Sequence, residues 1–306
     1  MALLFAYVAQ CWNLLGGVAG QLSLGHIMYF GVGAYTSSYL FTSYDVSPWL
    51  GMIAAGVVAA LLGIMVSFLG LRYGLRLDYY ALFTLALSQI IRVIFHNTKP
   101  LGGAMGISIP FKGESLLNLQ FMSKITYFYI VLIMVILLTL LLYRIMTSRM
   151  GKYFVALREN EDAAEALGVD TTRYKTIATI LSAFLTGMGG TVYAMYTMFI
   201  DPELMFGINP NFEFILMAII GGRGSLLGPI AGSLLLKPLA EITRVMFGSG
   251  KPGLFLMVYG ALLVITIIFL PKGLMGLIQR FYQRRRLAYI TSSGAGNPAS
   301  RGNEVI

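Results

Sequence analysis

Long apolar runs, separated by short polar segments, dominate the pattern of this chain. Many of the runs reach about 18 residues or more, the length at which an α-helix can cross the hydrocarbon core of a bilayer. No short segments of alternating polarity, typical of barrel strands, are visible. The pattern predicts transmembrane helices at 2–18, 26–43, 49–70, 79–97, 126–146, 176–200, 211–222, 228–247 and 254–270.

The Lys and Arg residues gather between these runs and predict an orientation. Basic loops of membrane proteins lie on the cytoplasmic side, which places 71–78, 147–175 and the tail around 280–286 inside. The segments between them, including the long loop 98–125, are then expected outside, together with the N-terminus. The abrupt apolar start at Met1 suggests that a first span is missing.

Composition agrees with a membrane protein and removes several other classes. Hydrophobic residues make up 57% of the 306 positions and charged residues only 11%, whereas a soluble core of this size would need far more polar surface. The net charge of +9 lies in loops and tail rather than on a binding face, which argues against nucleic acid as a partner. Cys11, His26 and His96 offer neither an intrachain disulfide nor metal-ligand spacing.

One inner loop contains a compact charged segment. Four acids fall within seven positions between Glu159 and Glu165. On a helical wheel these acids lie opposite an apolar arc, so the pattern predicts one short amphipathic helix over 152–168. Gly168 is expected to end this helix in the left-handed conformation, and Asp170 to cap the next helix, with Thr171 as the alternative cap.

This charged segment is expected to dock into another protein. The alternative is a helix lying on the inner leaflet, but such helices carry Lys and Arg on their polar face, and this one is net acidic. Small alanines allow close approach, and the acids can set the register by charge complementarity. The residues assigned to docking are Arg158, Glu161, Ala163, Ala164, Glu165 and Gly168.

Two glycine-rich segments, 16–26 and 221–229, interrupt the apolar runs. Both contain Gly-x-x-Ser-Leu, a weak hint of an internal repeat. Broken helices at membrane depth are tolerated where they are buried or line a wet cavity, and they mark substrate paths in transporters. A close helix contact through small residues is the alternative. The first segment has no Lys or Arg, which favours a path. Its candidate lining residues are Gln21, Ser23, His26 and Tyr29.

Ionisable residues within the spans are functional candidates, because charges are costly in a bilayer. Lys237, Glu241 and Arg244 are spaced so that they can neutralise one another on one helix face. Glu213 is then the one acid that suits a proton- or sodium-coupled carrier. No acid–base or nucleophile–base group converges in the sequence, so we assign no catalytic residue and expect a transport subunit rather than an enzyme.

Several motifs resemble those of a known family. Glu161-Asp-Ala-Ala-Glu-Ala-Leu-Gly168 is similar to the cytoplasmic coupling helix of bacterial ABC importer permeases, which seats in a groove of the ATPase subunit. Four further motifs resemble signatures of branched-chain amino acid permeases, and the likeness extends to about residue 280. It is strongest to the M-type permeases of high-affinity leucine-isoleucine-valine importers. These motifs are Gly20-Gln-Leu-Ser-Leu-Gly-His26 followed by Gly31-Val-Gly-Ala-Tyr35, Leu77-Asp-Tyr-Tyr-Ala-Leu-Phe-Thr-Leu85, Gly221-Gly-Arg-Gly-Ser-Leu-Leu-Gly-Pro229 and Pro271-Lys-Gly-Leu-Met-Gly276.

The resemblance implies an all-α polytopic membrane protein with the fold of the vitamin B12 and ribose-type (type II) permeases. The membrane domain is expected over 1–286, followed by a disordered cytoplasmic tail over 287–306. The implied function is half of the pore of an importer for branched-chain or related hydrophobic amino acids in the bacterial inner membrane. The implied partners are a second, homologous permease, two cytoplasmic ATPase subunits, an extracytoplasmic substrate-binding protein and membrane lipid.

The chain itself is expected to hold no cofactor and no metal. Gly248-Ser-Gly-Lys-Pro252 looks like a phosphate loop, but it lacks the first glycine and the Ser or Thr that must follow the lysine. ATP and magnesium are therefore expected on the partner ATPase subunits.

Three alternatives stay open at the level of sequence. Relatives carry urea, short amides or aromatic acids, and Gly102-Gly-Ala-Met-Gly-Ile107 departs from the family's Gly-Gly-Pro-Asn-Gly-Ile, so the cargo is not specified. A stand-alone secondary carrier would work without ATP and would depend on a buried acid such as Glu213. A purely structural assembly subunit would tolerate substitutions within 20–26.

Overall fold

The computed structural model describes residues 1–75, 77–247, 260 and 273–276. Helices occupy every predicted place except 254–270, of which the structure describes residue 260 alone; the tail 287–306 and the segment 248–252 lie outside the described residues. The chain is an all-α, multi-pass membrane protein. The helical segments that are long and apolar enough to cross a membrane are Pro48–Arg72, Asp78–Asn97, Lys124–Thr147, Thr171–Thr197 and Pro202–Gly222.

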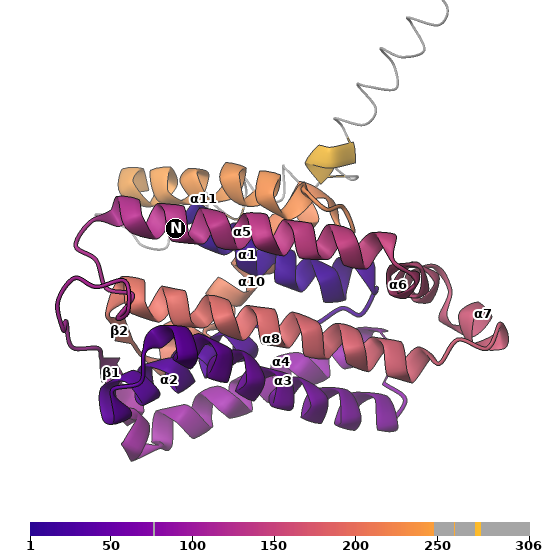
Figure 1. Ribbon diagram of the computed structural model, residues 1–306. Coiled ribbons are helices and arrows are strands. Elements are labelled where there is room, and N and C mark those ends of the chain that lie inside the picture. The colour runs from indigo at the N-terminus through magenta and orange to yellow at the C-terminus, as the bar shows by residue number, and fades with distance from the viewer. Residues whose placement is uncertain (76, 248–259, 261–272, 277–306) are drawn as a thin grey trace, which may run out of the picture.

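The elements follow one another along an up-and-down path through the bundle (Figure 1). The first half comprises α1 (Ala2–Trp12), a π-helical continuation (Asn13–Val18), α2 (Ile27–Tyr44), α3 (Pro48–Arg72), α4 (Leu77–Asn97) and β1 (Ile107–Ser108). The second half comprises α5 (Lys124–Thr147), α6 (Arg149–Glu159), α7 (Glu161–Ala166), α8 (Thr171–Thr197), β2 (Phe199–Ile200), α9 (Pro202–Phe206), α10 (Ile208–Gly222) and α11 (Gly228–Phe247).

Helix α8 packs against both α2 and α3 through small residues. A Cβ atom added to Gly33 would lie 2.2 Å from the carbonyl oxygen of Gly187, and one added to Gly190 would lie 2.1 Å from that of Phe30. Neither approach leaves room for a side chain. Close backbone packing of this kind drives helix association in lipid, where apolar burial offers no gain over contact with acyl chains.

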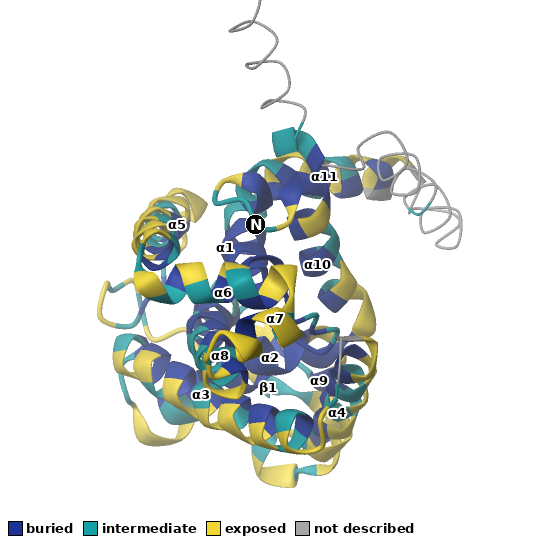
Figure 2. Ribbon diagram, turned by 90° about the vertical axis from the view of Figure 1, so that its right-hand side faces the viewer, coloured by how far each residue is buried: buried dark blue, intermediate teal, exposed yellow. Residues whose placement is uncertain are grey.

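Buried residues concentrate where α1, α2, α8 and α10 meet (Figure 2). The outward faces of α3, α4 and α5 are exposed but apolar, as at Leu61 and Leu137. Exposed leucines are unfavourable in water and suit a lipid environment. The pattern of burial therefore agrees with the membrane assignment.

The loops sort to two ends of the bundle. In Figure 1, α6, α7 and the start of α8 lie at one end, and β1 and β2 lie at the opposite end. The strands pair antiparallel, with Ile107 opposite Ile200. We call the end with α7 the inner end and the end with the strands the outer end, following the orientation that the basic residues predict.

Candidate functional site

The two glycine-rich segments and the charged segment meet at the inner end, in what we call the inner junction: residues 13–20, the end of α6 at Arg158, and residues 222–225. The Nη1 of Arg158 donates to the carbonyl oxygen of Gly17 over 3.3 Å, and the Nε of Arg223 donates to that of Gly16 over 2.8 Å. The first segment carries no Lys or Arg of its own. Its backbone carbonyl oxygens accept hydrogen bonds from arginines in two other parts of the chain.

Asn13 joins the two glycine-rich segments directly. Its Nδ2 donates to the carbonyl oxygen of Ser225, and its Oδ1 accepts from the backbone N–H of Gly224, both over 2.8 Å. A Cβ atom on Gly17 would lie 2.6 Å from the nitrogen of Gly224. The segments that are predicted as separate helix breaks thus form a single contact.

Helix α6 rests on the first glycine-rich segment. Gly20 has a φ of +77°, and a Cβ atom there would lie 2.8 Å from the Cα of Arg158. A cavity of about 430 Å³ opens beside this contact and is lined by Gly17, Gly20, Arg158, Glu159 and Arg223. Burial and the neighbouring charge of Arg158 lower the pKa of the Arg223 guanidinium.

The expectation of one continuous helix over 152–168 is wrong. The structure has two helices, α6 and α7, with a break at Asn160 (φ −160°, ψ 109°). The Oδ1 of Asn160 accepts from the backbone N–H of Ala163 over 3.0 Å. Asparagine is a poor residue for a helix interior and among the best N-caps, so it starts a new helix here instead of continuing the old one.

Helix α7 projects from the inner end with most of its surface exposed (Figure 1). Ala164 is buried, whereas Ala163 and Glu165 are exposed. The Nζ of Lys175 donates to the Oε1 of Glu161 and so ties α7 to the start of α8. Leu167, expected on the apolar arc, is 86% exposed.

The predicted end of this segment is confirmed. Gly168 has a φ of +84°, the left-handed conformation that glycine adopts at little cost. The carboxylate of Asp170 accepts from the backbone N–H of Arg173 over 2.9 Å and caps α8. Asp170, and not Thr171, is therefore the cap.

The four residues predicted to line a path are all buried in the segment that connects the π-helix to α2 or in the first turn of α2. Each carries a polar atom without a hydrogen-bond partner among the described residues; these atoms are Gln21 Nε2, Ser23 Oγ, His26 Nδ1 and Tyr29 OH. Buried polar atoms nearly always find partners in folded proteins. Four residues within nine positions of the chain thus keep hydrogen-bonding capacity that the described residues do not use. Whether the four residues line the path stays a prediction.

Polar side chains from distant helices hold this segment in place. The Nε2 of His26 lies 2.8 Å from the Oγ1 of Thr186, and the Oγ1 of Thr179 donates to Gln21 over 3.3 Å. The Oδ1 of Asn211 accepts from the N–H of Ile27, and its Nδ2 donates to the carbonyl oxygen of Leu24. These partners are not among the predicted residues. The one available signal is a polar residue inside an apolar run.

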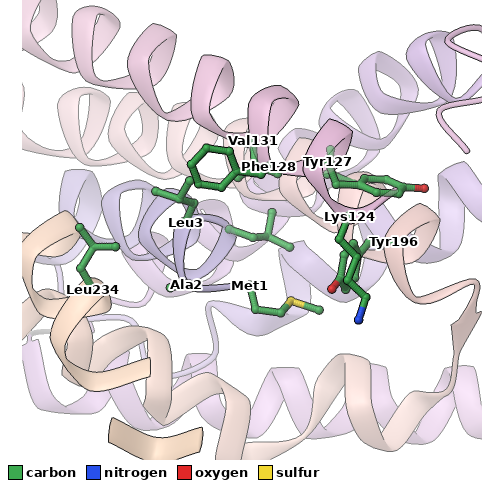
Figure 3. A pocket seen from close by; sticks show the side chains of 11 residues that line it. Met1, Ala2, Leu3, Lys124, Tyr127, Phe128, Val131, Tyr196 and Leu234 are labelled. Atoms are coloured by element: carbon green, nitrogen blue, oxygen red, sulfur yellow. The ribbon is translucent and has the colours of Figure 1, made fainter. Parts of the chain in front are cut away.

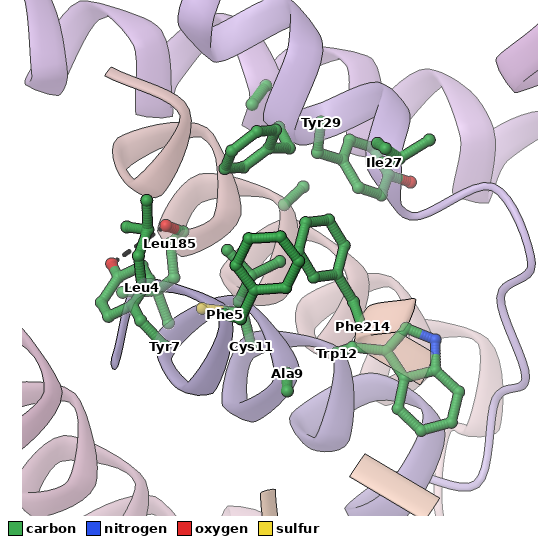
Figure 4. Close-up of a cluster of buried hydrophobic side chains, with 14 of the residues drawn as sticks. Leu4, Phe5, Tyr7, Ala9, Cys11, Trp12, Ile27, Tyr29, Leu185 and Phe214 are labelled. Atoms are coloured by element: carbon green, nitrogen blue, oxygen red, sulfur yellow. Dashed lines mark hydrogen bonds between the residues drawn. The ribbon is translucent and has the colours of Figure 1, made fainter. Parts of the chain in front are cut away.

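Glu213 does not stand alone, contrary to the expectation. The Nζ of Lys237 lies 2.9 Å from its Oε2, so α11 pairs with α10 here. Lys237 also lies over the ring of Phe5, 3.8 Å from its centre. The side chain of Arg244 lies outside the described part of the structure, so neutralisation along α11 stays a prediction. Phe5 and Phe214 are in ring contact at 4.8 Å (Figure 4). A paired acid is less suited to a proton- or sodium-coupled carrier than the lone acid expected from the sequence.

Comparison with known proteins gives a consistent set of similarities. The family model described as "Branched-chain amino acid transport system / permease component" matches residues 1–267. The high-affinity branched-chain amino acid transport system permease protein LivM of Salmonella typhimurium is 29% identical over 300 residues, with 90% of this chain and 68% of that protein covered. LivM of Escherichia coli K12 is 30% identical over 288 residues, with 86% and 65% covered.

A second type of relative is more distant but matches along nearly its whole length. The permease protein LivH of Salmonella typhimurium is 23% identical over 292 residues, with 89% of this chain and 91% of that protein covered. The chain spans about two thirds of the length of the two LivM proteins. No solved structure matches it.

Proposed function

We propose, since this chain belongs to the family of permease components of branched-chain amino acid transport systems, that it is one half of the pore of an ATP-driven importer. The proposed cargo is a branched-chain or similar hydrophobic amino acid. The proposed location is the bacterial inner membrane, and the proposed fold is that of the type II permeases.

The observation that carries the proposal is the inner end of the molecule. Helix α7 projects there with acids and Leu167 exposed, while α6 behind it rests on Gly20 and sends Arg158 into the first glycine-rich segment. A partner that closes against α7 would therefore move a structure that is in contact with the membrane part. We assign this partner as an ATPase subunit, which holds ATP and magnesium.

The remaining partners follow from the same proposal. Similarity to both LivM and LivH supports pairing with a second, homologous permease. A binding protein would deliver the amino acid at the outer end, where the long loop with β1 lies. The path would run past Gln21, Ser23, His26 and Tyr29, whose unpartnered polar atoms can receive the polar groups of the cargo.

The test is ATP-driven uptake of labelled leucine by proteoliposomes that contain the assembled transporter. Glu165→Lys reverses an exposed charge on α7, and Gly168→Pro replaces a residue whose φ of +84° proline cannot adopt. Both variants are expected to insert normally but to lose uptake and co-purification of the ATPase subunits. Asp78→Lys reverses an exposed acid at the start of α4 and serves as the matched control, with uptake retained.

Two results would overturn the proposal. Uptake of leucine by the chain without any ATPase subunit would mean a stand-alone carrier. Normal ATPase binding and normal uptake in both Glu165→Lys and Gly168→Pro would mean that the ATPase subunit docks elsewhere. Uptake of urea, short amides or aromatic acids in place of leucine would keep the machinery and change the cargo.

A further inference from the structure

An ion pair lies among apolar side chains of α1, α10 and α11. It is not part of the inner junction. Lys237 stands in the middle of α11, and its Nζ lies 2.9 Å from the Oε2 of Glu213 on α10. The side chains are 13% and 25% exposed, respectively. Both groups are thus mostly buried, but neither is sealed from the surroundings.

Stability alone is a weak reason for such a pair. Removing two charges from water costs about as much as their attraction returns, so apolar replacements of buried pairs are often neutral or stabilising. In membrane helices, ionisable residues concentrate on the routes of substrates and ions. Here a cation and an anion stand side by side, which is the charge pattern that complements a zwitterion.

A largely apolar cavity lies between α1, α5, α8 and α11 (Figure 3), and its lining stops short of the pair itself. It is lined by Leu4, which precedes Phe5 on α1, and by Leu234, three positions before Lys237 on α11. Its volume of about 330 Å³ lies in the range of small-molecule sites, about 300–1,000 Å³. The other residues that line it are Met1, Ala2, Leu3, Lys124, Tyr127, Phe128, Val131, Val192 and Tyr196.

Pro238 adds a polar group at the same place. It lies inside α11 and has no N–H to donate to the carbonyl oxygen of Leu234, four positions earlier. The carbonyl oxygen of Leu234, a residue that lines the cavity, therefore lacks its usual hydrogen bond within the helix. Discontinuities of this kind provide ligand contacts in transporter helices.

We propose that the Lys237–Glu213 pair and this cavity form a transit site for the amino acid. Glu213 receives the ammonium group, Lys237 receives the carboxylate, and the branched side chain enters the cavity beside Leu4 and Leu234. The two protein charges pair with each other when no cargo is present and exchange partners when it passes. This inference rests on the proposed function.

The first experiment neutralises the pair in the assembled transporter. Glu213→Gln/Lys237→Met keeps the approximate shape and removes both charges, so no lone charge is left buried. Leucine uptake is expected to fall by at least about tenfold to a hundredfold, because the loss of one charge-assisted contact has that effect and this variant loses two. ATP hydrolysis stimulated by the loaded binding protein is expected to stay near the wild-type rate, because the proposed contact between α7 and the ATPase subunit is unchanged.

A matched control removes another interhelical ion pair. Arg92 on α4 lies 2.6 Å from Glu203 on α9, and Arg92→Gln/Glu203→Gln is expected to leave uptake unchanged. A second variant, Leu234→Phe, narrows the cavity without touching the pair. It is expected to reduce leucine uptake more than valine uptake, because leucine has the longer side chain.

The outcomes separate this inference from the proposed function. If the wild-type assembly shows no ATP-driven leucine uptake, the proposed function fails. If the wild type transports leucine and the neutral double variant transports it equally well, the pair is structural and the transit site is wrong. An unchanged ratio of leucine to valine uptake in Leu234→Phe would overturn the cavity assignment in the same way.

Discussion

Single glycines decide whether the inner junction can form. Gly17 faces the backbone of Gly224, and Gly20 faces the backbone of Arg158, at distances that exclude even a methyl group. Backbone atoms cannot move aside as the end of a flexible side chain can. One additional methyl group at either glycine would therefore disrupt the inner junction.

This gives a prediction for Gly17→Ala. The new methyl group would lie 2.0 Å from the Oδ1 of Asn13 and 2.6 Å from the nitrogen of Gly224, so we expect a loss of about 1–3 kcal/mol of stability, as for other overpacked sites. In Gly63→Ala, the nearest atoms are farther away: the Cβ of Ala183 at 3.0 Å, the carbonyl oxygen of Thr179 at 3.4 Å and the Cα of Ile180 at 3.7 Å. This variant is the control and is expected to cost less. Thermal denaturation in detergent measures both, and equal melting temperatures would contradict the prediction.

Residues with a local role could be predicted from the sequence, and residues with a distant partner could not. Gly168 and Asp170 were assigned correctly because a helix end is encoded within a few neighbouring positions. The bond from Asn13 to Ser225 joins residues 212 positions apart. The pairing of Glu213 with Lys237 depends on which helix faces which, and spacing along α11 alone favoured a different partner.

Among the elements, α7 depends most on its own ends. It has six residues, Glu161–Ala166, too few for a stable helix in isolation. The cap from Asn160 and the bond from Lys175 to Glu161 supply the missing stabilisation. The presentation of its exposed acids thus depends on one amide cap and one ion pair.

Asn160→Ala tests this dependence. The loss of a cap costs about 0.5–2 kcal/mol, which is enough to unfold an element of this size locally. We expect faster backbone hydrogen exchange over 161–167 and reduced ATPase binding, while α8 keeps its protection. Asn160→Ser preserves the capping oxygen and is expected to behave like the wild type. Equal exchange in the alanine and serine variants would count against the cap.

The helices that span the membrane were the most predictable elements, because a long apolar run has few other folds available to it. The division of the charged segment into α6 and α7 was not predicted, since the helical wheel treats Asn160 as one more position on an arc. The strands β1 and β2 have two residues each. Two residues are too few to show the alternation of polar and apolar positions from which a strand can be predicted.

For the whole molecule, the sorting of loops to two ends has a direct test. Met122 is 81% exposed at the outer end and Leu167 is 86% exposed at the inner end, while the native Cys11 is fully buried. In intact cells, a membrane-impermeant maleimide is expected to label Met122→Cys at once and Leu167→Cys only after permeabilisation. Labelling of Leu167→Cys in intact cells would reverse the orientation.

The tightness of the inner junction has a mechanical consequence. Interiors packed to contact have low compressibility and pass on displacements. Because Gly20 leaves no gap beneath the backbone of Arg158, a shift of α6 has no free play to take up before it reaches the first glycine-rich segment. Under the proposed function, the joint would act as a rigid lever, so that a movement of α6 set by the docked ATPase subunit would reach the membrane part without delay.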